Sequence, residues 1–387
     1  MTWKKVRLGD VADSCLGKML DQEKNRGEYQ PYLANVNVRW GSFDLENLPQ
    51  MRFLESEEDR YGLKYGDLIV CEGGEPGRCA IWKEQVPNMK FQKALHRVRV
   101  HNNVDYRYLF YWFLFAGKRG ALDQYFTGAT IKHMPGDKLK SIILDLPPLE
   151  QQKKIADVLS AYDDLIENNQ KQIKLLEEAA QRLYKEWFID LRFPGHESTP
   201  IVAGIPEGWR EETIENLVEY HDRCRKPLSS TERASFQGRY PYYGAAGILD
   251  HVKEYLFDGT YLLLGEDGTV ISPDGFPILQ YVFGQFWVNN HAHVLTGKGI
   301  YSTEFIYMLF EHTKVSDVVT GVAQPKISQA RLNSKRVLIP CDELVTRYTR
   351  STKESFDKIL VLEEETNNLI EIRDRLLPKL MSGEIIL

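Results

Sequence analysis

Residues 149–187 read LEQQKKIADVLSAYDDLIENNQKQIKLLEEAAQRLYKEW, and apolar side chains recur along this stretch at alternating steps of four and three. That rhythm is the seam of a coiled coil, in which one helix packs its apolar stripe against another. The predicted seam includes Ile155, Leu159, Tyr162, Ile166, Asn169, Ile173, Leu176 and Leu183. The pattern therefore predicts a long helix that needs a partner helix.

A second stretch keeps the same rhythm less regularly. Its seam positions are Ile359, Leu362, Leu369, Leu376 and Leu380. Because the first helix must run away from its own domain and the second must run back, we expect an antiparallel pair. Over roughly 33 residues at about 1.5 Å each, the pair would be about 50 Å long. Asn169 lies in the apolar seam opposite Thr366, and two interpretations stay open: a buried amide that fixes the register, or a solvent-facing residue at a frayed stretch.

An internal repeat organises the rest of the chain. Several segments recur in the same order at an offset of about 195 residues, which indicates duplication. The matched segments are Trp3–Ala12 with Trp209–Val218, Gly66–Val70 with Gly259–Leu263, Ala94–His96 with His291–His293, and Thr127–Lys132 with Thr320–Lys326. Each half holds short strand-like runs separated by Gly, Pro and Asn turns, with one stronger helix after the middle strands. Each half is therefore predicted to be an α+β domain with a mostly β core.

The predicted organisation has five parts. They are a first domain over 1–147, a long helix over 148–192, a Pro- and Gly-rich linker over 193–208, a second domain over 209–340 and a second long helix over 341–387. We call the two domains the first head and the second head. The fold class is two similar, mostly β domains joined by two long helices that pack as an antiparallel coiled coil.

Composition describes an ordinary globular chain. Of the 387 residues, 43% are hydrophobic and 27% are charged, and the five cysteines lack the close paired spacing of a zinc site. No apolar run is long enough to span a membrane, and no leader opens the sequence, so we expect a cytoplasmic protein without membrane contact. The net charge of −6 does not announce a DNA-binding protein, although a local basic stripe is enough for phosphate contacts.

Catalytic signatures are absent. No phosphate-binding loop, zinc-protease motif, nucleophile elbow or dinucleotide fingerprint is present, and no Asn-Pro-Pro-Tyr-type methyltransferase motif appears. His291 and His293 lack further ligands at helpful spacing, so a structural or DNA-facing role is favoured over a metal site. Asp67 with Glu72 and Glu266 with Asp267 resemble parts of a nuclease cluster, but solvated turns commonly carry such carboxylates. We predict no catalytic residue and no metal site.

The first head interleaves cations with aromatic and amide side chains. Arg and Lys suit guanine, Asn and Gln suit adenine, and further cations suit phosphates. A charged stretch can also be just a solvated face, and that interpretation applies to each residue. The candidate DNA contacts are Lys18, Asn37, Arg39, Trp40, Arg78, Lys90, Lys93, Arg97, Lys132 and His133. The loop from Glu72 to Arg78 is the most specific of these signals, because its glycines permit close backbone approach.

The second head is poorer in cations. Its basic residues gather at three places, and polar loops supply the remaining candidates. The candidate DNA contacts are Arg225, Lys226, Arg239, Tyr242, Tyr243, Asn289, Asn290, His291, Gln324 and Lys326.

Several of these motifs together resemble the specificity subunits of type I restriction-modification systems, over essentially the full length. The segments that carry the resemblance are Leu146–Ala156, Gly66–Val70, Gly73–Arg78, Tyr242–Gly244, Thr127–His133, Gly321–Ile327 and Arg375–Ile385. Two departures stand out. Leu338–Leu344 lacks the Glu-Gln pair of the first helix entry, and Glu266-Asp267-Gly268 stands where relatives often carry a cation and more glycine.

The resemblance implies a non-catalytic subunit that reads double-stranded DNA as two short blocks separated by a spacer of indifferent sequence. It also implies two modification subunits that methylate adenine and two restriction subunits that translocate and cut. S-adenosylmethionine, ATP and Mg would be bound by those partners, with no cofactor in this chain. The alternative is a coiled-coil scaffold whose heads bind proteins and not DNA.

Overall fold

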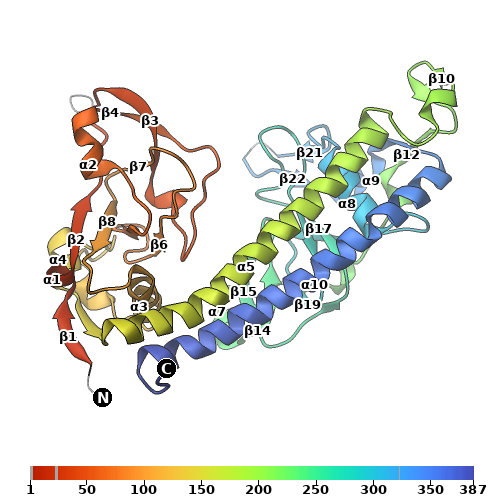
Figure 1. The fold of residues 1–387 in the computed structure, drawn as a ribbon. Helices are drawn as coiled ribbons and strands as arrows, with labels where there is room; N and C mark the ends of the chain where they lie inside the picture. Colours follow the sequence, from red (N-terminus) through yellow and green to blue (C-terminus); the bar gives the residue numbers. More distant parts are fainter. Residues whose placement is uncertain (1–2, 22–24, 322) are drawn as a thin grey trace. The chain divides into compact units, whose positions relative to one another are not determined.

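The computed structural model describes residues 3–21, 25–321 and 323–387, so Val322 of the second predicted turn lies outside the described residues (Figure 1). The chain forms two compact units, one of residues 1–168 with 366–387 and the other of residues 169–365. Each unit holds one head and a part of each long helix. Among the described helices, none combines the length and apolarity that crossing a membrane requires.

The described residues of the first unit form three sheets. The four-stranded sheet has the order β2 (Ala12–Leu16), β8 (Leu95–Val100), β5 (Leu68–Cys71) and β6 (Cys79–Ile81). The three-stranded sheet has the order β4 (Gln50–Phe53), β3 (Glu28–Leu33) and β7 (Lys90–Phe91), and β1 (Lys4–Arg7) pairs with β9 (Ile143–Leu146). The short helices are α1 (Leu8–Val11), α2 (Glu58–Tyr61) and α4 (Gly136–Ser141).

Helix α3 (Tyr106–Lys118) closes the core of the first head. Asp105 caps it, because its side chain accepts hydrogen bonds from the backbone N–H groups of Arg107 and Tyr108. The helix then buries a run of aromatic and aliphatic side chains in the same cluster as Leu68, Val70 and Val98 of the four-stranded sheet. Burial of apolar side chains between α3 and the four-stranded sheet therefore stabilises the first head.

The second unit repeats this plan. Its main sheet has the order β13 (Val218–Tyr220), β20 (Ala292–Gly297), β17 (Tyr261–Gly265) and β18 (Leu279–Val282). A second sheet has the order β15 (Ile248–Val252), β14 (Gln237–Tyr243), β19 (Gln285–Val288) and β16 (Phe257–Asp258), and β12 (Arg210–Thr213) pairs with β23 (Arg336–Ile339). The remaining elements are α6 (Ile214–Leu217), α7 (Ser230–Ser235), α8 (Thr303–Glu311), α9 (Gln329–Ser334), β10 (Ile201–Val202), β11 (Ile205–Pro206), β21 (Val319–Thr320) and β22 (Lys326–Ile327).

The two heads share topology as well as element order. The parallel pair β3–β7 of the first head corresponds to the parallel pair β14–β19 of the second. Within the main sheets, Val70 pairs with His96 and Leu264 pairs with His293. The duplication is therefore confirmed, but the match of Gly66–Val70 to Gly259–Leu263 is wrong by one residue, since Val70 corresponds to Leu264.

Helices α5 (Leu149–Tyr184) and α10 (Asp342–Met381) pack antiparallel within each unit (Figure 1). In the second unit, Asn169 donates to Glu365 at 3.2 Å and the Tyr348 hydroxyl donates to the Ala180 carbonyl at 2.9 Å, so rising numbers in α5 meet falling numbers in α10. In the first unit, Arg373 pairs with Asp163. A π-helical turn, Lys185–Ile189, follows α5.

The predicted seam faces inward. The buried positions are Ile155, Leu159, Ile166, Asn169, Ile173, Ile359, Leu362 and Leu380, and the half-buried ones are Tyr162, Leu176, Leu183, Leu369 and Leu376. Asn169 is only 4% exposed, which favours the buried-amide interpretation over the frayed one. Its hydrogen bond to Glu365 offsets part of the cost of burying the amide.

Three half-buried carboxylates gather in the second unit, on Glu177 of α5, Glu311 at the end of α8 and Glu363 of α10. Burial raises the pKa of each, and the charges of Glu363 and Glu311 raise the pKa of Glu177 further. A carboxyl whose pKa is higher in the folded state than in the unfolded state does not lower the free energy of unfolding below the unfolded pKa. It lowers that free energy increasingly as the pH rises from the unfolded pKa to the folded pKa, and fully above the folded pKa.

We therefore expect Glu363→Gln to raise the free energy of unfolding at pH 8 by roughly 0.5 kcal/mol, a small value because water partly screens the charge. The gain should shrink toward pH 4. Urea unfolding at both pH values measures it, with Glu364→Gln as the control because Glu364 is exposed. An equal gain at both pH values, or the same gain in the control, would count against the carboxylate cluster as its source.

Candidate nucleic-acid interface

In the first head, the glycine loop and the predicted turn lie together. The glycine loop, residues 72–78, follows β5, and the turn, residues 127–133, closes on itself through two backbone hydrogen bonds between Thr127 and His133. The Met134 N–H donates to the Glu72 carbonyl at 2.7 Å, and Gly73 forms a β-bridge with His133. Two segments about 55 residues apart in sequence, both predicted to face DNA, thus form one surface.

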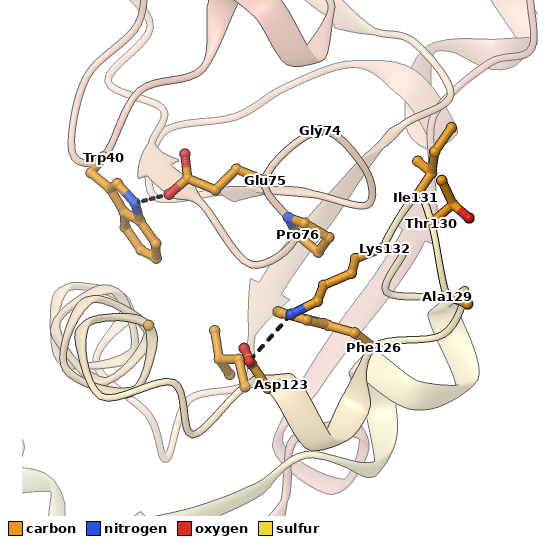
Figure 2. A pocket seen from close by; sticks show the side chains of 12 residues that line it. Trp40, Gly74, Glu75, Pro76, Asp123, Phe126, Ala129, Thr130, Ile131 and Lys132 are labelled. Atoms are coloured by element: carbon orange, nitrogen blue, oxygen red, sulfur yellow. Dashed lines mark hydrogen bonds and ion pairs between the residues drawn. The ribbon is translucent and has the colours of Figure 1, made fainter. Parts of the chain in front are cut away.

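A hollow of about 500 Å³ separates the glycine loop from the end of α3 and the turn (Figure 2). On one side the Trp40 indole N–H donates to Glu75 at 2.7 Å. On the other, Lys132 pairs with Asp123 at 3.3 Å and lies over the Phe126 ring. The polar side chains that Figure 2 joins already bond one another, Trp40 with Glu75 and Lys132 with Asp123.

Four of the first-head candidates are buried by their own domain. Lys18 pairs with Glu57 at 2.6 Å, Lys90 pairs with Glu58 at 2.9 Å, and Arg97 donates to three backbone carbonyls. Asn37 accepts from the Ala34 N–H and donates to the Asp44 carbonyl. Their exposed fractions are 8% or less, which argues against direct contact with DNA in this conformation.

The remaining first-head candidates reach the surface to different extents. Arg78 is largely enclosed and donates to Glu75 and to the Asn35 carbonyl, so it ties the glycine loop to the segment after β3. Trp40 is half-buried. The exposed candidates are Arg39, Lys93, Lys132 and His133.

The second head builds the corresponding surface from a different sequence. The Ile327 N–H donates to the Glu266 carbonyl at 2.8 Å, the Gly268 N–H donates to the Pro325 carbonyl at 3.0 Å, and Asp267 forms a β-bridge with Lys326. The acidic loop, residues 266–268, therefore contacts the turn around Lys326 as the glycine loop contacts its own turn. The two heads present equivalent loop-and-turn surfaces.

Burial divides the second-head candidates as well. Tyr242 is 1% exposed and its hydroxyl accepts from the Leu228 N–H, while Asn289 is 4% exposed and accepts from the His291 N–H. Tyr243 is half-buried against Phe286. The exposed candidates are Lys226, Arg239, Asn290, His291, Gln324 and Lys326. DNA contact stays a prediction for each of them.

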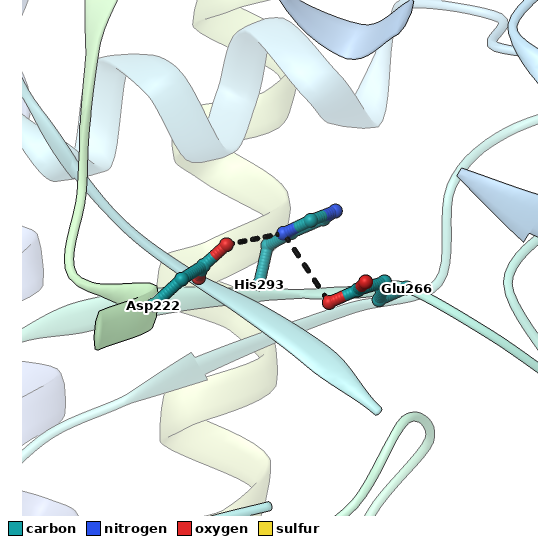
Figure 3. A group of neighbouring side chains, drawn as sticks. All are labelled: Asp222, Glu266 and His293. Carbon is teal, nitrogen blue, oxygen red and sulfur yellow. Dashed lines mark hydrogen bonds and ion pairs between the residues drawn. The ribbon is translucent and has the colours of Figure 1, made fainter. Parts of the chain in front are cut away.

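Asp222, Glu266 and His293 form a cluster beneath this surface, with potential ligand atoms within 4.8 Å of one another (Figure 3). The Arg225 guanidinium already lies 2.7 Å from Glu266 and 3.4 Å from Asp222, and the Lys326 ammonium lies 3.2 Å from Glu266. A divalent cation would have to displace these charges. The cluster is therefore an ion network, and the absence of a metal site stays a prediction.

Asp222 is ionised in this network. Burial alone would raise the pKa of its carboxyl, but the hydrogen bond from His293 and the nearby Arg225 charge outweigh burial and hold the pKa below its usual value. In the first head, burial lowers the pKa of the equivalent His96, whose Nε2 donates to the Met134 carbonyl. Sequence analysis did not single out Asp222, because its partner His293 is 71 residues away and no local pattern links them.

Residues 1–178 and 206–371 match the family model described as the type I restriction modification DNA specificity domain. The chain belongs to this family. The type I restriction enzyme MjaIX specificity subunit of Methanocaldococcus jannaschii is 28% identical over 339 residues, covering 83% of this chain and 78% of the relative. The MjaVIII specificity subunit of the same organism is 28% identical over 412 residues, covering 99% and 93%.

A solved structure of this family has the same fold. The type I restriction-modification S subunit from M. genitalium matches with a TM-score of 0.54 at 18% identity, covering 98% of this chain and 96% of that one. At that identity the likeness concerns the fold alone. It agrees with the predicted α+β architecture of two similar heads with long helices.

Proposed function

We propose that this chain is the DNA-reading subunit of a type I restriction-modification enzyme, and that its target consists of two short specific blocks separated by an indifferent spacer. The observation that carries this proposal is the repeated surface: each head brings a loop and a polar turn together. Two equivalent reading surfaces on one chain favour two half-sites. Family membership supports DNA as the ligand.

The long helices have two proposed roles. Their paired length sets the distance between the half-sites, as a spacer between two reading surfaces would. Their solvent-facing residues outside the seam, such as Leu165 at 48% and Leu175 at 64% exposure, offer contacts for partner subunits. The partners proposed are two modification subunits and two restriction subunits.

The chemistry is proposed to lie in those partners. The modification subunits would bind S-adenosylmethionine and methylate adenine, and the restriction subunits would use ATP and Mg. This chain would recognise the target sequence, bind no cofactor and act in the cytoplasm without membrane contact. The division is supported by the lack of catalytic motifs in the sequence and by the self-neutralised ion network of the second head.

A methyl-transfer assay on duplexes with randomised sequence tests the proposal. The modification subunit with this chain is expected to methylate only molecules that contain a two-block motif, and the modification subunit alone should select none. Unselective methylation in both reactions would contradict the proposal and favour a scaffold that binds proteins. Cleavage or methyl transfer by this chain alone would contradict the non-catalytic assignment.

A further inference from the structure

The turn around Lys326 in the second head is held by ionic contacts with the side chain of Glu266. Glu266 is 15% exposed at its side chain, and its carboxylate receives Lys326 of the turn at 3.2 Å. Its backbone carbonyl also accepts the N–H of Ile327, the next residue, at 2.8 Å. One residue thus fixes the turn through both its side chain and its backbone.

The contacts continue from Glu266 to Asp222 and His293, and Figure 3 shows the ring of His293 joined to both carboxylates. Arg225 donates to Glu266 at 2.7 Å and lies 3.4 Å from Asp222. Asp222 bonds Nδ1 of His293 at 2.6 Å, and Nε2 of His293 contacts the Ile327 carbonyl at 2.9 Å. The contacts therefore start at Lys326 and return to Ile327, the next residue, so that the backbone of the turn closes the ring.

The ring also neutralises negative charge. Two adjacent carboxylates, Glu266 and Asp267, lie in a loop proposed to approach phosphates, and like charges there would repel. Glu266 faces two cations, and Asp267 bonds His291. The first head uses another device, in which the Arg78 guanidinium holds the glycine loop.

Lys326 keeps donor capacity toward solvent. Its side chain is 46% exposed, and an ammonium group has three hydrogens, of which the contact with Glu266 uses one. A second acceptor can therefore bind while the contact with Glu266 is kept. The O6 and N7 acceptors of guanine in the major groove are the base edges that lysine recognises.

We infer that Glu266 is a positioning residue that aims Lys326 at a guanine edge in the second half-site. Arg225 then supports Glu266 and does not itself contact DNA. This inference rests on the proposed function. It predicts that loss of the Glu266 charge changes one position of the second block and leaves the first block and the spacer unchanged.

The test uses the complex of the full chain with its modification subunit, a randomised duplex library and S-adenosylmethionine. With Glu266→Gln, preference for guanine at one position of the second block should fall about tenfold, the scale of a single base contact. Lys326→Met should relax the same position. Glu211→Gln is the control, because it breaks an exposed ion pair with Arg336 in the same head.

The possible outcomes separate the claims. If wild-type protein selects no two-block motif, the proposed function fails. If it does and Glu266→Gln selects an identical motif, the inference fails. Uniform weakening by Lys326→Met, with unchanged base preference and a reduced salt dependence, would show a phosphate contact and overturn it. If Glu266→Gln does not fold, Lys326→Met decides alone, since Lys326 is exposed: relaxation of one guanine supports the inference and an unchanged motif overturns it.

Discussion

Duplicating one heptad in each long helix is expected to lengthen the preferred spacer between the half-sites by about three base pairs. The duplicated segments are residues 162–168 of α5 and 359–365 of α10, which end at the level where Asn169 bonds Glu365. Seven helical residues add about 10 Å, and each base pair spans about 3.4 Å. A heptad leaves the helix rotated by only ~20°, whereas three base pairs turn DNA by about 100°, so we also expect weaker binding.

Selection from a library of spacers of different lengths measures this change. The matched control places seven residues after Gly204, in the exposed turn between β10 and β11, which adds chain without lengthening α5 or α10. The control should keep the original spacer. A spacer that stays the same in the double-heptad variant, with the protein folded and assembled, would contradict the role of the helices in setting half-site distance.

Leu159→Ala is expected to lower the free energy of unfolding by about 3 kcal/mol, because it removes a fully buried side chain and leaves a cavity. Leu159 is 0% exposed and packs in the first-unit cluster with Ile155 of α5 and Leu377 of α10. Leu165→Ala, on the same helix and in the same unit, removes a side chain that is 48% exposed. It should cost less than about 0.5 kcal/mol.

Urea unfolding followed by circular dichroism compares the two variants. The first-unit transition should move to lower urea only in Leu159→Ala. Equal destabilisation by both substitutions would mean that the seam does not carry the helix pairing.

The helix pair was predictable because its signal is local. A seven-residue period identifies which face is buried without knowledge of the partner, and the buried positions Leu159, Ile166 and Leu362 agree with it. Asn169 could not be settled in this way, because a polar residue in a seam suits either a buried amide or a frayed turn. Its hydrogen-bond partner is Glu365, 196 residues away in the sequence.

The DNA contacts were harder to predict from the sequence, because a cationic residue has the same sequence signature whether it binds DNA or a backbone carbonyl. Lys18 bonds Glu57, 39 residues away, and Arg97 bonds carbonyls 35 to 38 residues away. These partners depend on how loops pack and leave no periodic trace. The turn residues Lys132 and Lys326 were easier to place, since a glycine-containing turn is a local feature.

The internal repeat was also predicted only in part from the sequence. Its existence followed from the order of matched segments, but the register of one strand was wrong by one residue, because Val70 corresponds to Leu264 through their pairing with His96 and His293. A single residue gained or lost in the preceding turn shifts an apolar strand against its match without changing its composition. Strand pairing was needed to fix it.

The most direct test of the central claim is genome-wide adenine methylation, read by single-molecule sequencing in a host that expresses this chain with its modification subunit. A second host lacks only this chain. We predict a two-block motif in the first host that disappears in the second. An unchanged methylation pattern would contradict the assignment of sequence reading to this chain.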